Sequence, residues 1–403
     1  MEKMTICLNM IVKDESKIIL NTLNNLIENI KLDYWVICDT GSSDNTRELI
    51  VDFFKEKDIS GELHNIPWKN FAYNRTKALE LAYKKTDFIF IFDADDRIRG
   101  NLILPKLEHG YAYKIQFGHN LKWKRLCLID NHLIWYYEGV MHELIGTKEE
   151  YKVFTIEGEY HIATNVEVSA RNKKGPQKFV EDAKILEKAY ENKDHLQMRY
   201  AFYAGECYRF SGKENWNKSI KWYKIAANGD KTWPQERYWA CYQIGNIYRD
   251  LDEKEKCWYW WFKSYQFDTT RQEAFFELIK ECRSKNKFKT GYNLYKMLDK
   301  MEKEDIEHKL FIIPHIYDHS LYSEMLIILF YLKKFDEAND ILKLLFNAKT
   351  PIKPYIELLN FNLTFFLPYI KKDDWELYAK FQRYSKKYDV PDELIKSIDN
   401  IFI

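Results

Sequence analysis

The stretch FIFIFDADD (residues 88–96) carries five apolar residues that run directly into three carboxylates. The apolar run has the length and composition of a buried strand, and a strand that ends in a cluster of like charges is electrostatically costly. In an extended chain, residues two apart point to the same side, so Asp93 and Asp95 can turn their oxygens toward one point. A divalent cation at that point would offset the repulsion, and hard oxygen ligands favour Mg²⁺ or Mn²⁺. The alternative is a solvated turn in which Asp93, Asp95 and Asp96 cap a following helix.

Strand-like runs alternate with amphipathic segments over about the first 165 residues. Ile19, Leu23 and Leu26 recur on one helical face, and Asp14 is placed to cap that helix. Such alternation predicts an α/β, Rossmann-like domain with a mostly parallel sheet and helices on both faces. The expected strands lie at 5–12, 34–39 and 87–92, and the expected helices lie within 13–30, 45–57 and 72–85.

A second acidic cluster, DTGSSD (39–44), follows the expected second strand. Gly41 permits a tight strand-to-helix turn, and the residues after it can cap the next helix. This explanation leaves out Asp39, which lies at the strand end where a base or ribose could be bound. Ligands of parallel sheets bind outside the carboxyl ends of the strands, so both acidic clusters are expected to line one crevice.

From about residue 178 the pattern is helical to the end. The segments AGECYR (204–209), IGNIYR (244–249) and LIKECR (278–283) align, and a second amphipathic segment follows each of them. Helix pairs repeating every 34 to 40 residues predict a tetratricopeptide-like stack. The expected organisation is a catalytic domain at 1–165, a linker or active-site loop at 166–178, and a helical repeat domain at 179–403.

The composition restricts the class of protein. Lys plus Arg (62) nearly balances Asp plus Glu (61), which argues against a nucleic-acid partner. No apolar run approaches the ~18 residues of a membrane span. The 7 cysteines lack a CxxC pair and are expected to be buried thiols in a reducing compartment. A soluble cytoplasmic protein is expected, in the host cytoplasm or virion if the source is a virus.

Four motifs together resemble a known family. VKDES (12–16), CDTGSSDNT (38–46), IPWKNFAYNRTKAL (66–79) and FIFDADD (90–96) occur in the order and spacing typical of family 2 glycosyltransferases with the GT-A fold. The following helices look like those of the subgroup with tetratricopeptide-like repeats, which includes bacterial peptide S-glycosyltransferases. The resemblance covers residues 4–165 closely and the helical part loosely.

The resemblance implies roles for particular residues. Asp39 would bind the nucleobase of a nucleotide-sugar, and Arg75 would reach the base or the phosphates. Asp93 would hold the ribose or the cation, and Asp95 the cation itself. Arg75 could instead be a structural ion-pair partner of Asp39 or Asp93. The implied nucleotide-sugar-binding set is Asn9, Asp39, Arg75, Asp93 and Arg125, the last of which lies where the family often places an arginine on the acceptor side.

The segment EGVMHEL (138–144) resembles the part of the family that carries the catalytic base. An inverting transfer needs a group that takes the acceptor's proton. Glu143 is the first candidate, and His142 and Glu138 are the substitutes. A hydrogen-bonded pair at a strand end is the competing interpretation of Glu143 and His142. His161 resembles the late histidine that joins Asp93 and Asp95 in the metal shell, although a lone histidine is more often structural.

The expected function is an inverting glycosyltransferase, dependent on Mn²⁺ or Mg²⁺, that moves a hexosyl group from a UDP-sugar to a peptide, protein or glycan. The helices would hold the acceptor or pair two subunits. Arg171, Lys173 and Lys174 could close over the diphosphate, or simply be a solvated linker. The alternatives are a sugar nucleotidyltransferase, which would be expected to carry a Gly-rich loop after the first strand, and a non-catalytic adaptor.

Overall fold

The computed structural model describes residues 4–164, 175–299 and 309–402. Residues Arg171, Lys173 and Lys174 of the expected loop lie outside this range. The chain divides into two compact units, Met1–Thr232 with Glu307–Leu310 (unit 1) and Trp233–Ile306 with Phe311–Ile403 (unit 2).

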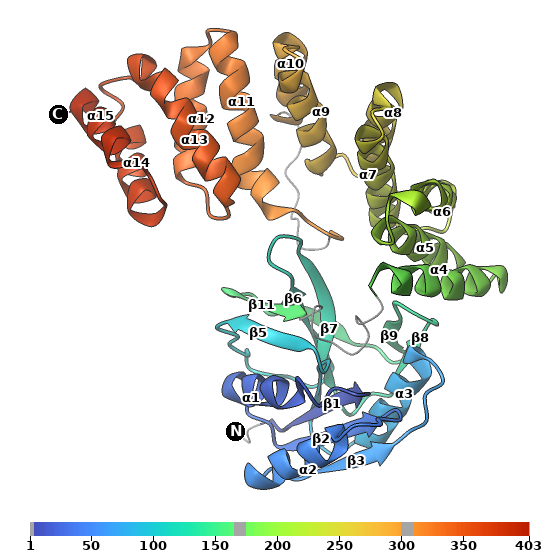
Figure 1. The fold of residues 1–403 in the computed structure, drawn as a ribbon. Helices are drawn as coiled ribbons and strands as arrows, with labels where there is room; N and C mark the ends of the chain where they lie inside the picture. The colour runs from blue at the N-terminus through green and yellow to red at the C-terminus, as the bar shows by residue number, and fades with distance from the viewer. Residues whose placement is uncertain (1–3, 165–174, 300–308, 403) are drawn as a thin grey trace. The chain divides into compact units, whose positions relative to one another are not determined.

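Unit 1 is built on a mixed, mostly parallel sheet with the strand order β3-β2-β1-β4-β7-β6-β11-β5 (Figure 1). A ninth strand, β10, pairs with the first part of β6, whereas β11 pairs with the end of β6. The first four strands in this order are parallel, whereas β7 is antiparallel to both of its neighbours. The predicted fold class, an α/β domain of the GT-A type followed by helices, is confirmed. The strands are β1 (Ile6–Val12), β2 (Tyr34–Asp39), β3 (Gly61–Asn65), β4 (Phe88–Ile91), β5 (Asp96–Gly100), β6 (Tyr111–Phe117), β7 (Trp123–Asp130), β10 (Lys152–Thr155) and β11 (Tyr160–Thr164).

Alternate residues of the central strands fill two cores, one on each face of the sheet. Ile6, Leu8 and Met10 of β1 pack with helices α1 (Ile19–Asn29) and α2 (Thr46–Glu56). Cys7, between them in sequence, packs on the other face with helix α3 (Phe71–Ala82) and strand β8 (Trp135–Glu138). Strand β8 forms a separate hairpin with β9 (Leu144–Thr147). This period-two pattern is the physical reason why the sheet is covered on both faces.

The strand register brings the two acidic clusters to one edge of the sheet. Val12 of β1 pairs with Asp39 of β2. On the other side of β1, Asn9 pairs with Ile91 of β4, so Asp93 lies level with the last residues of β1. Asp39 and Asp93 therefore flank the carboxyl end of β1.

The predicted cap of the first helix is wrong. Helix α1 begins at Ile19, and the residue before it makes no side-chain cap. Asp14 lies further upstream with a φ of 55°, and its carboxylate accepts hydrogen bonds from the backbone N and the Oγ of Ser43, at 2.7 and 3.0 Å. Asp14 thus links the loop after β1 to the turn before α2.

Helices form the rest of both units. Unit 1 continues with α4 (Pro176–Glu191), α5 (Gln197–Phe210) and α6 (Trp216–Asn228), so the contacts group three helices with the sheet, beyond the expected boundary at residue 165. Unit 2 contains α7 (Pro234–Asp250), α8 (Lys254–Tyr265), α9 (Glu273–Ser284), α10 (Phe288–Asp299), α11 (Leu321–Tyr331), α12 (Phe335–Phe346), α13 (Lys353–Phe366), α14 (Trp375–Lys387) and α15 (Asp392–Phe402).

Each aligned segment lies in the first helix of a pair, in α5, α7 and α9. In two of the helix pairs, the two helices pack against each other in the same way. A Cβ on Gly205 of α5 would meet the ring of Tyr223 on α6, and a Cβ on Gly245 of α7 would meet the ring of Trp261 on α8. A glycine at this position lets an aromatic ring of the second helix pack directly on the backbone of the first.

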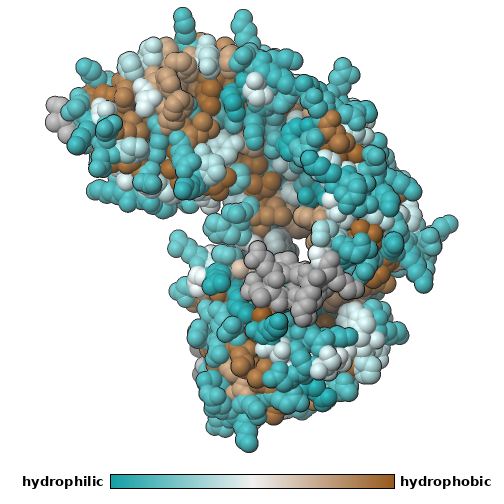
Figure 2. Space-filling model, in the orientation of Figure 1, coloured by the Kyte–Doolittle hydropathy of each residue, from teal (hydrophilic) through white to brown (hydrophobic). Residues whose placement is uncertain are grey.

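The surface in Figure 2 is largely hydrophilic, with hydrophobic side chains in scattered patches. Within the described ranges, no helix combines the length and the apolar character needed to cross a membrane. All seven cysteines are described by the structure, and each is a buried thiol outside any disulfide.

A buried histidine makes the stability of unit 2 depend on pH. His319 is fully buried, and burial lowers its pKa to about 4 from the ordinary 6.5. The neutral form is therefore favoured in the folded state, so the stabilisation is complete above pH 6.5 and is lost as the pH falls toward 4. We expect the free energy of unfolding to drop by about 2–3 kcal/mol over this range, and the His319→Gln variant to lose less. Urea unfolding at pH 7, 5.5 and 4.5 measures this, and equal slopes in both proteins would contradict it.

Candidate active site

Asp39 ends β2, and only one of its two carboxylate oxygens accepts hydrogen bonds from the described residues. Its Oδ1 accepts hydrogen bonds from the backbone N of Gly41 at 2.8 Å and of Ser42 at 2.9 Å, which shapes the turn after the strand. Its Oδ2 is buried and accepts no hydrogen bond from any described residue. Asp39 is 1% exposed, and an unpaired buried acceptor is costly. A ligand that brings a hydrogen-bond donor would satisfy it.

Arg75 joins two carboxylates that lie far apart in the sequence. Helix α3 points it toward the end of β4, where its Nη2 lies 2.6 Å from Oδ1 of Asp93. Its Nε lies 2.7 Å from Oε1 of Glu143. Burial lowers the pKa of Arg75, but Asp93 and Glu143 together raise it well above its usual value. Of the two ion-pair partners considered for Arg75, Asp93 is the one that the structure shows.

Arg125 of β7 is the second cation of this cluster. Its Nη1 lies 3.5 Å from Oδ2 of Asp93, and its guanidinium lies over the ring of Phe117. Burial raises the pKa of Asp93, but Arg75 and Arg125 outweigh it and hold this pKa below the usual range. Asp93 is therefore a carboxylate between two guanidinium groups.

At the other two carboxylates of the stretch, nearby positive charge does not outweigh burial. Burial, followed by the charge of Asp93, raises the pKa of Asp95. The same two causes raise the pKa of Asp96 to about 7, although Oδ1 of Asp96 accepts a hydrogen bond from Oγ1 of Thr164 at 2.8 Å. Additional positive charge beside Asp95 would favour its ionised form. The donor set at this place thus fits Mg²⁺ or Mn²⁺, which prefer carboxylate oxygens.

Glu143 lies in the connection between β8 and β9, and helix α5 braces that connection. The ring of His142 stacks on Tyr203 with centroids 3.8 Å apart, and the backbone O of His142 accepts a hydrogen bond from Nε of Arg199 at 3.0 Å. His142 has a φ of 52°, which turns the chain so that Glu143 can face Arg75. Of the three candidate bases, Glu143 is the one joined to the acidic cluster.

The substitutes for the base have other partners. Glu138, at the end of β8, lies 3.2 Å from Nε2 of His195, and both side chains are largely exposed. The imidazole of His142 is packed against Tyr203, as described above. Neither residue has a described ion pair with Arg75, Arg125 or the carboxylates at the end of β4.

Asn9 and His161 lie apart from these carboxylates. Nδ2 of Asn9 donates to the backbone O of Ala78 at 2.8 Å, which ties β1 to α3. His161 pairs with Arg99 in the β5–β11 ladder, three residues, or about 10 Å, from the residue that pairs with Asp96. Burial, followed by His119, Lys122 and Arg99, lowers the pKa of His161. Such cationic neighbours disfavour a metal ion, so the structure does not assemble the expected set of Asp93, Asp95 and His161.

Several residues of the site carry no signal in the sequence. Thr164 holds Asp96, Tyr137 lies under the guanidinium of Arg75 at 5.8 Å, and Tyr203 supports the connection that carries Glu143. Each acts through a contact between distant parts of the chain, and none belongs to a motif.

Comparison with known proteins shows a family similarity in the N-terminal part. Residues 7–111 match the model of glycosyl transferase family 2. No curated protein matches the chain. Among solved structures, residues 1–349 of S. aureus TarS in complex with UDP-GlcNAc align with a TM-score of 0.30 and 12% identity, covering 65% of this chain and 91% of that chain. BtubC (BKLC) from P. vanneervenii aligns with a TM-score of 0.37 and 7% identity, covering 58% and 91%.

The family match includes β1, the turn at Asp39, helix α3 with Arg75, and the carboxylates that follow β4. Over residues 7–111 the chain is therefore similar to glycosyl transferase family 2.

Proposed function

We propose that the protein is an inverting glycosyltransferase that moves a sugar from a UDP-sugar to a peptide, protein or glycan. The observation that carries the proposal is the ion-paired bridge of Arg75 between Glu143 and Asp93, at the edge of the sheet where Asp39 and Asp95 also lie. It connects a candidate base with the carboxylates expected around the donor's diphosphate.

Asp39 would select the nucleobase. Its buried Oδ2 is an acceptor without a described donor, and the ring N–H of uracil is a donor of suitable size. Buried polar groups that stay unpaired penalise a ligand lacking the matching group, so this oxygen favours a base with an imide N–H.

Glu143 would take the proton from the acceptor group as that group attacks the sugar carbon. Arg75 fixes the position of this carboxylate, and the stack of His142 on Tyr203 fixes the backbone beside it. The sugar carbon gains positive charge in the transition state, which nearby carboxylates stabilise. Arg125, paired with Asp93, would bind the acceptor side or the donor.

Asp95 would be the main protein ligand of Mg²⁺ or Mn²⁺, with Asp93 beside it. When bound, such an ion neutralises the charge on the departing diphosphate. Asp95 suits this role because burial and Asp93 both disfavour its ionised form in the absence of added positive charge. Asp95 follows the end of β4 by four residues, and Asp39 ends the parallel strand β2, which supports a role for both residues at the same edge of the sheet.

The helices would serve the acceptor. Pairs such as α7 with α8 resemble tetratricopeptide repeats, and we infer that they hold a peptide, protein or glycan, or pair two subunits. Peptide S-glycosylation is one reaction within this proposal. Seven buried cysteines that form no disulfide are compatible with a reducing, cytoplasmic location.

The experiment that tests the proposal measures hydrolysis and transfer with UDP-, GDP- and dTDP-sugars, with Mn²⁺ or with a chelator. We expect release of UDP that requires the metal. Release of pyrophosphate from a sugar phosphate and UTP would instead identify a nucleotidyltransferase. A lack of turnover and of nucleotide binding would favour an adaptor.

Replacing Asp95 by asparagine separates the metal's role from folding. The change keeps the shape of the side chain and removes one charge from a cluster that is short of positive charge, so we expect the free energy of unfolding to stay equal or rise. Turnover is expected to fall on the order of 100-fold or more, because the leaving group loses its bound cation. Initial rates across a Mn²⁺ titration measure this effect, and an unchanged Mn²⁺ dependence in the variant would exclude Asp95 as the ligand.

A further inference from the structure

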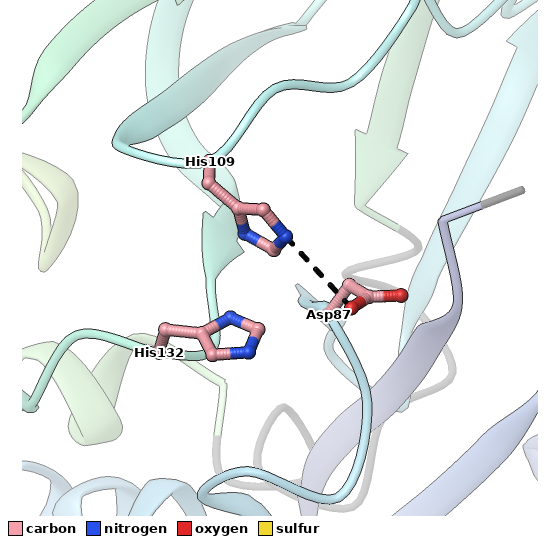
Figure 3. A group of neighbouring side chains, drawn as sticks. All are labelled: Asp87, His109 and His132. Atoms are coloured by element: carbon pink, nitrogen blue, oxygen red, sulfur yellow. Dashed lines mark ion pairs between the residues drawn. The ribbon is translucent and has the colours of Figure 1, made fainter. Parts of the chain in front are cut away.

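A second group of possible metal ligands lies at the opposite end of β4. Asp87 directly precedes this strand, His109 precedes β6, and His132 follows β7. Each of the three offers one ligand atom, and these atoms all lie within 4.8 Å of one another (Figure 3). Six residues of extended chain separate Asp87 from Asp93, which places this group about 20 Å from the proposed active site.

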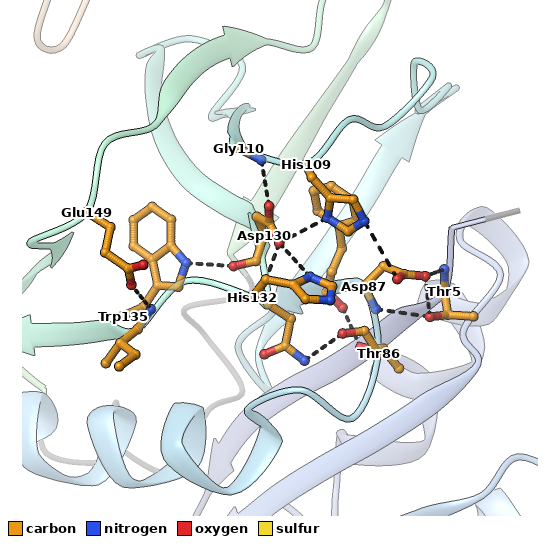
Figure 4. A network of polar contacts seen from close by, with 12 residues as sticks. Thr5, Thr86, Asp87, His109, Gly110, Asp130, His132, Trp135 and Glu149 are labelled. Atoms are coloured by element: carbon orange, nitrogen blue, oxygen red, sulfur yellow. Dashed lines mark hydrogen bonds and ion pairs between the residues drawn. The ribbon is translucent and has the colours of Figure 1, made fainter. Parts of the chain in front are cut away.

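A buried carboxylate orients both imidazoles. Oδ1 of Asp130 lies 3.3 Å from Nδ1 of His109 and 3.0 Å from Nδ1 of His132 (Figure 4). Asp130 is itself fixed, because its Oδ2 accepts the backbone N–H of Gly110 at 2.6 Å and its side chain is only 2% exposed. An ionised carboxylate only accepts hydrogen bonds, so both histidines carry their proton on Nδ1. Their Nε2 lone pairs are then available to a ligand.

Asp87 is oriented in a similar way. Its Oδ2 accepts hydrogen bonds from the backbone N and from Oγ1 of Thr5, both at 2.7 Å. The other oxygen of Asp87, Oδ1, lies 3.9 Å from Nε2 of His109. Figure 3 shows this oxygen and the two imidazoles facing one space. One oxygen is thus held by the protein while the other is presented beside the histidines.

We propose that Asp87, His109 and His132 bind a first-row divalent cation such as Zn²⁺. Two imidazole nitrogens and one carboxylate oxygen form a ligand set that zinc accepts, with water in the fourth position. A carboxylate behind metal-binding histidines is the arrangement that fixes their tautomer and orientation. The side chains of His109 and His132 are each 47% exposed, so the rings have room to move the short distance that coordination requires.

The cation would stabilise the domain rather than take part in sugar transfer. It would connect the start of β4, the start of β6 and the end of β7, and through Asp87 also the segment before β1. These segments adjoin the edge of the sheet opposite the carboxyl end of β4. A hard cation at Asp95 and a borderline cation at the histidines differ in ligand chemistry, so they are separable by experiment.

Titration of the chelator-treated full chain with Zn²⁺ tests the proposal by calorimetry, with Co²⁺ absorption as a report on nitrogen ligands. We expect one site per chain and a higher thermal midpoint with Zn²⁺. His132→Ala and His109→Ala are each expected to weaken binding at least about 100-fold, and Asp130→Asn, a positioning residue, about 10–100-fold. Because both histidines are about half exposed, their removal leaves the core intact, which far-UV circular dichroism verifies.

Two matched variants locate the site. His64→Ala removes a histidine of the same unit that pairs with a single carboxylate, Glu62, at 2.8 Å, and it is expected to bind Zn²⁺ like the natural chain. Asp95→Asn is also expected to keep the Zn²⁺ affinity while losing the Mn²⁺ dependence of turnover. The proposal is overturned if the double variant His109→Ala/His132→Ala binds Zn²⁺ as tightly as the natural chain, or if His64→Ala weakens binding equally.

Discussion

The Glu143→Gln variant is expected to transfer sugar about 10²–10⁴-fold more slowly than the natural protein, because a positioned general base contributes an effect of this size. The amide keeps the shape of the carboxylate and can still accept a hydrogen bond from Nε of Arg75, which lies 2.7 Å from Oε1 in the structure. The position of Arg75 is thereby preserved while the group that accepts the proton is removed. Single-turnover rates with saturating donor and acceptor measure the loss.

Glu138→Gln is the matched control. It removes a carboxylate from the same hairpin, but its partner is the exposed His195, so turnover is expected to stay within about twofold. Donor binding to Glu143→Gln, followed by thermal shift with UDP, is expected to be unchanged. A Glu143→Gln enzyme with full activity would contradict the assignment of the base, and a large effect of Glu138→Gln would transfer that role to Glu138.

The sheet edge that carries the site could be predicted because local patterns encode it. Five apolar residues before Asp93 require a buried strand, and the same holds for the run before Asp39. Parallel strands that alternate with helices place such strand ends together. In the structure, Val12 pairs with Asp39 and Asn9 pairs with Ile91, so the ends of β2 and β4 lie on either side of the end of β1.

The partners within the site could not be predicted because they are distant in sequence. Arg75 and Glu143 are 68 residues apart, and so are Asp96 and Thr164. The motif that contains Arg75 is compatible with binding a ligand or with pairing a carboxylate, and only the fold selects Asp93 and Glu143 as its neighbours. The sequence does not predict which residue pairs with His161. In the structure, the pairing of β11 with β5 places His161 beside Arg99.

The extent of unit 1 also follows from long-range packing. A change from strand-like to helical pattern suggests a boundary at residue 165, yet helices α4, α5 and α6 belong to the same compact unit as the sheet. Helix α5 contributes directly to the proposed active site, because Tyr203 of α5 stacks on His142 and so supports the backbone beside the proposed base. Periodicity identifies elements, but it does not tell which surfaces they cover.

Replacing Arg271 by methionine is expected to cost unit 2 about 3–5 kcal/mol, the usual effect of removing one partner from a buried ion pair. Arg271 and Glu273 are both 0% exposed, with Nη2 of Arg271 2.8 Å from Oε1 and Nε 3.1 Å from Oε2 of Glu273. The guanidinium also donates to Oε1 of Gln235 at 2.9 Å and to the backbone O of Phe311 at 3.1 Å. Methionine leaves all of these acceptors buried. The midpoint and slope of urea unfolding of the full chain, followed by tryptophan fluorescence, measure the loss.

The double variant Arg271→Met/Glu273→Leu distinguishes an uncompensated charge from lost packing. Removing both charges is expected to recover part of the stability, since buried pairs can often be replaced by apolar residues. Recovery is limited because the hydroxyls of Tyr317 and Tyr238, at 2.9 and 3.3 Å from Oε2 of Glu273, lose their acceptor. Lys353→Met, in a largely exposed pair with Glu357 at 3.7 Å, is the matched control and is expected to leave the midpoint unchanged. If the double variant is as unstable as Arg271→Met alone, the buried charge of Glu273 contributes nothing. The loss of stability then comes from packing.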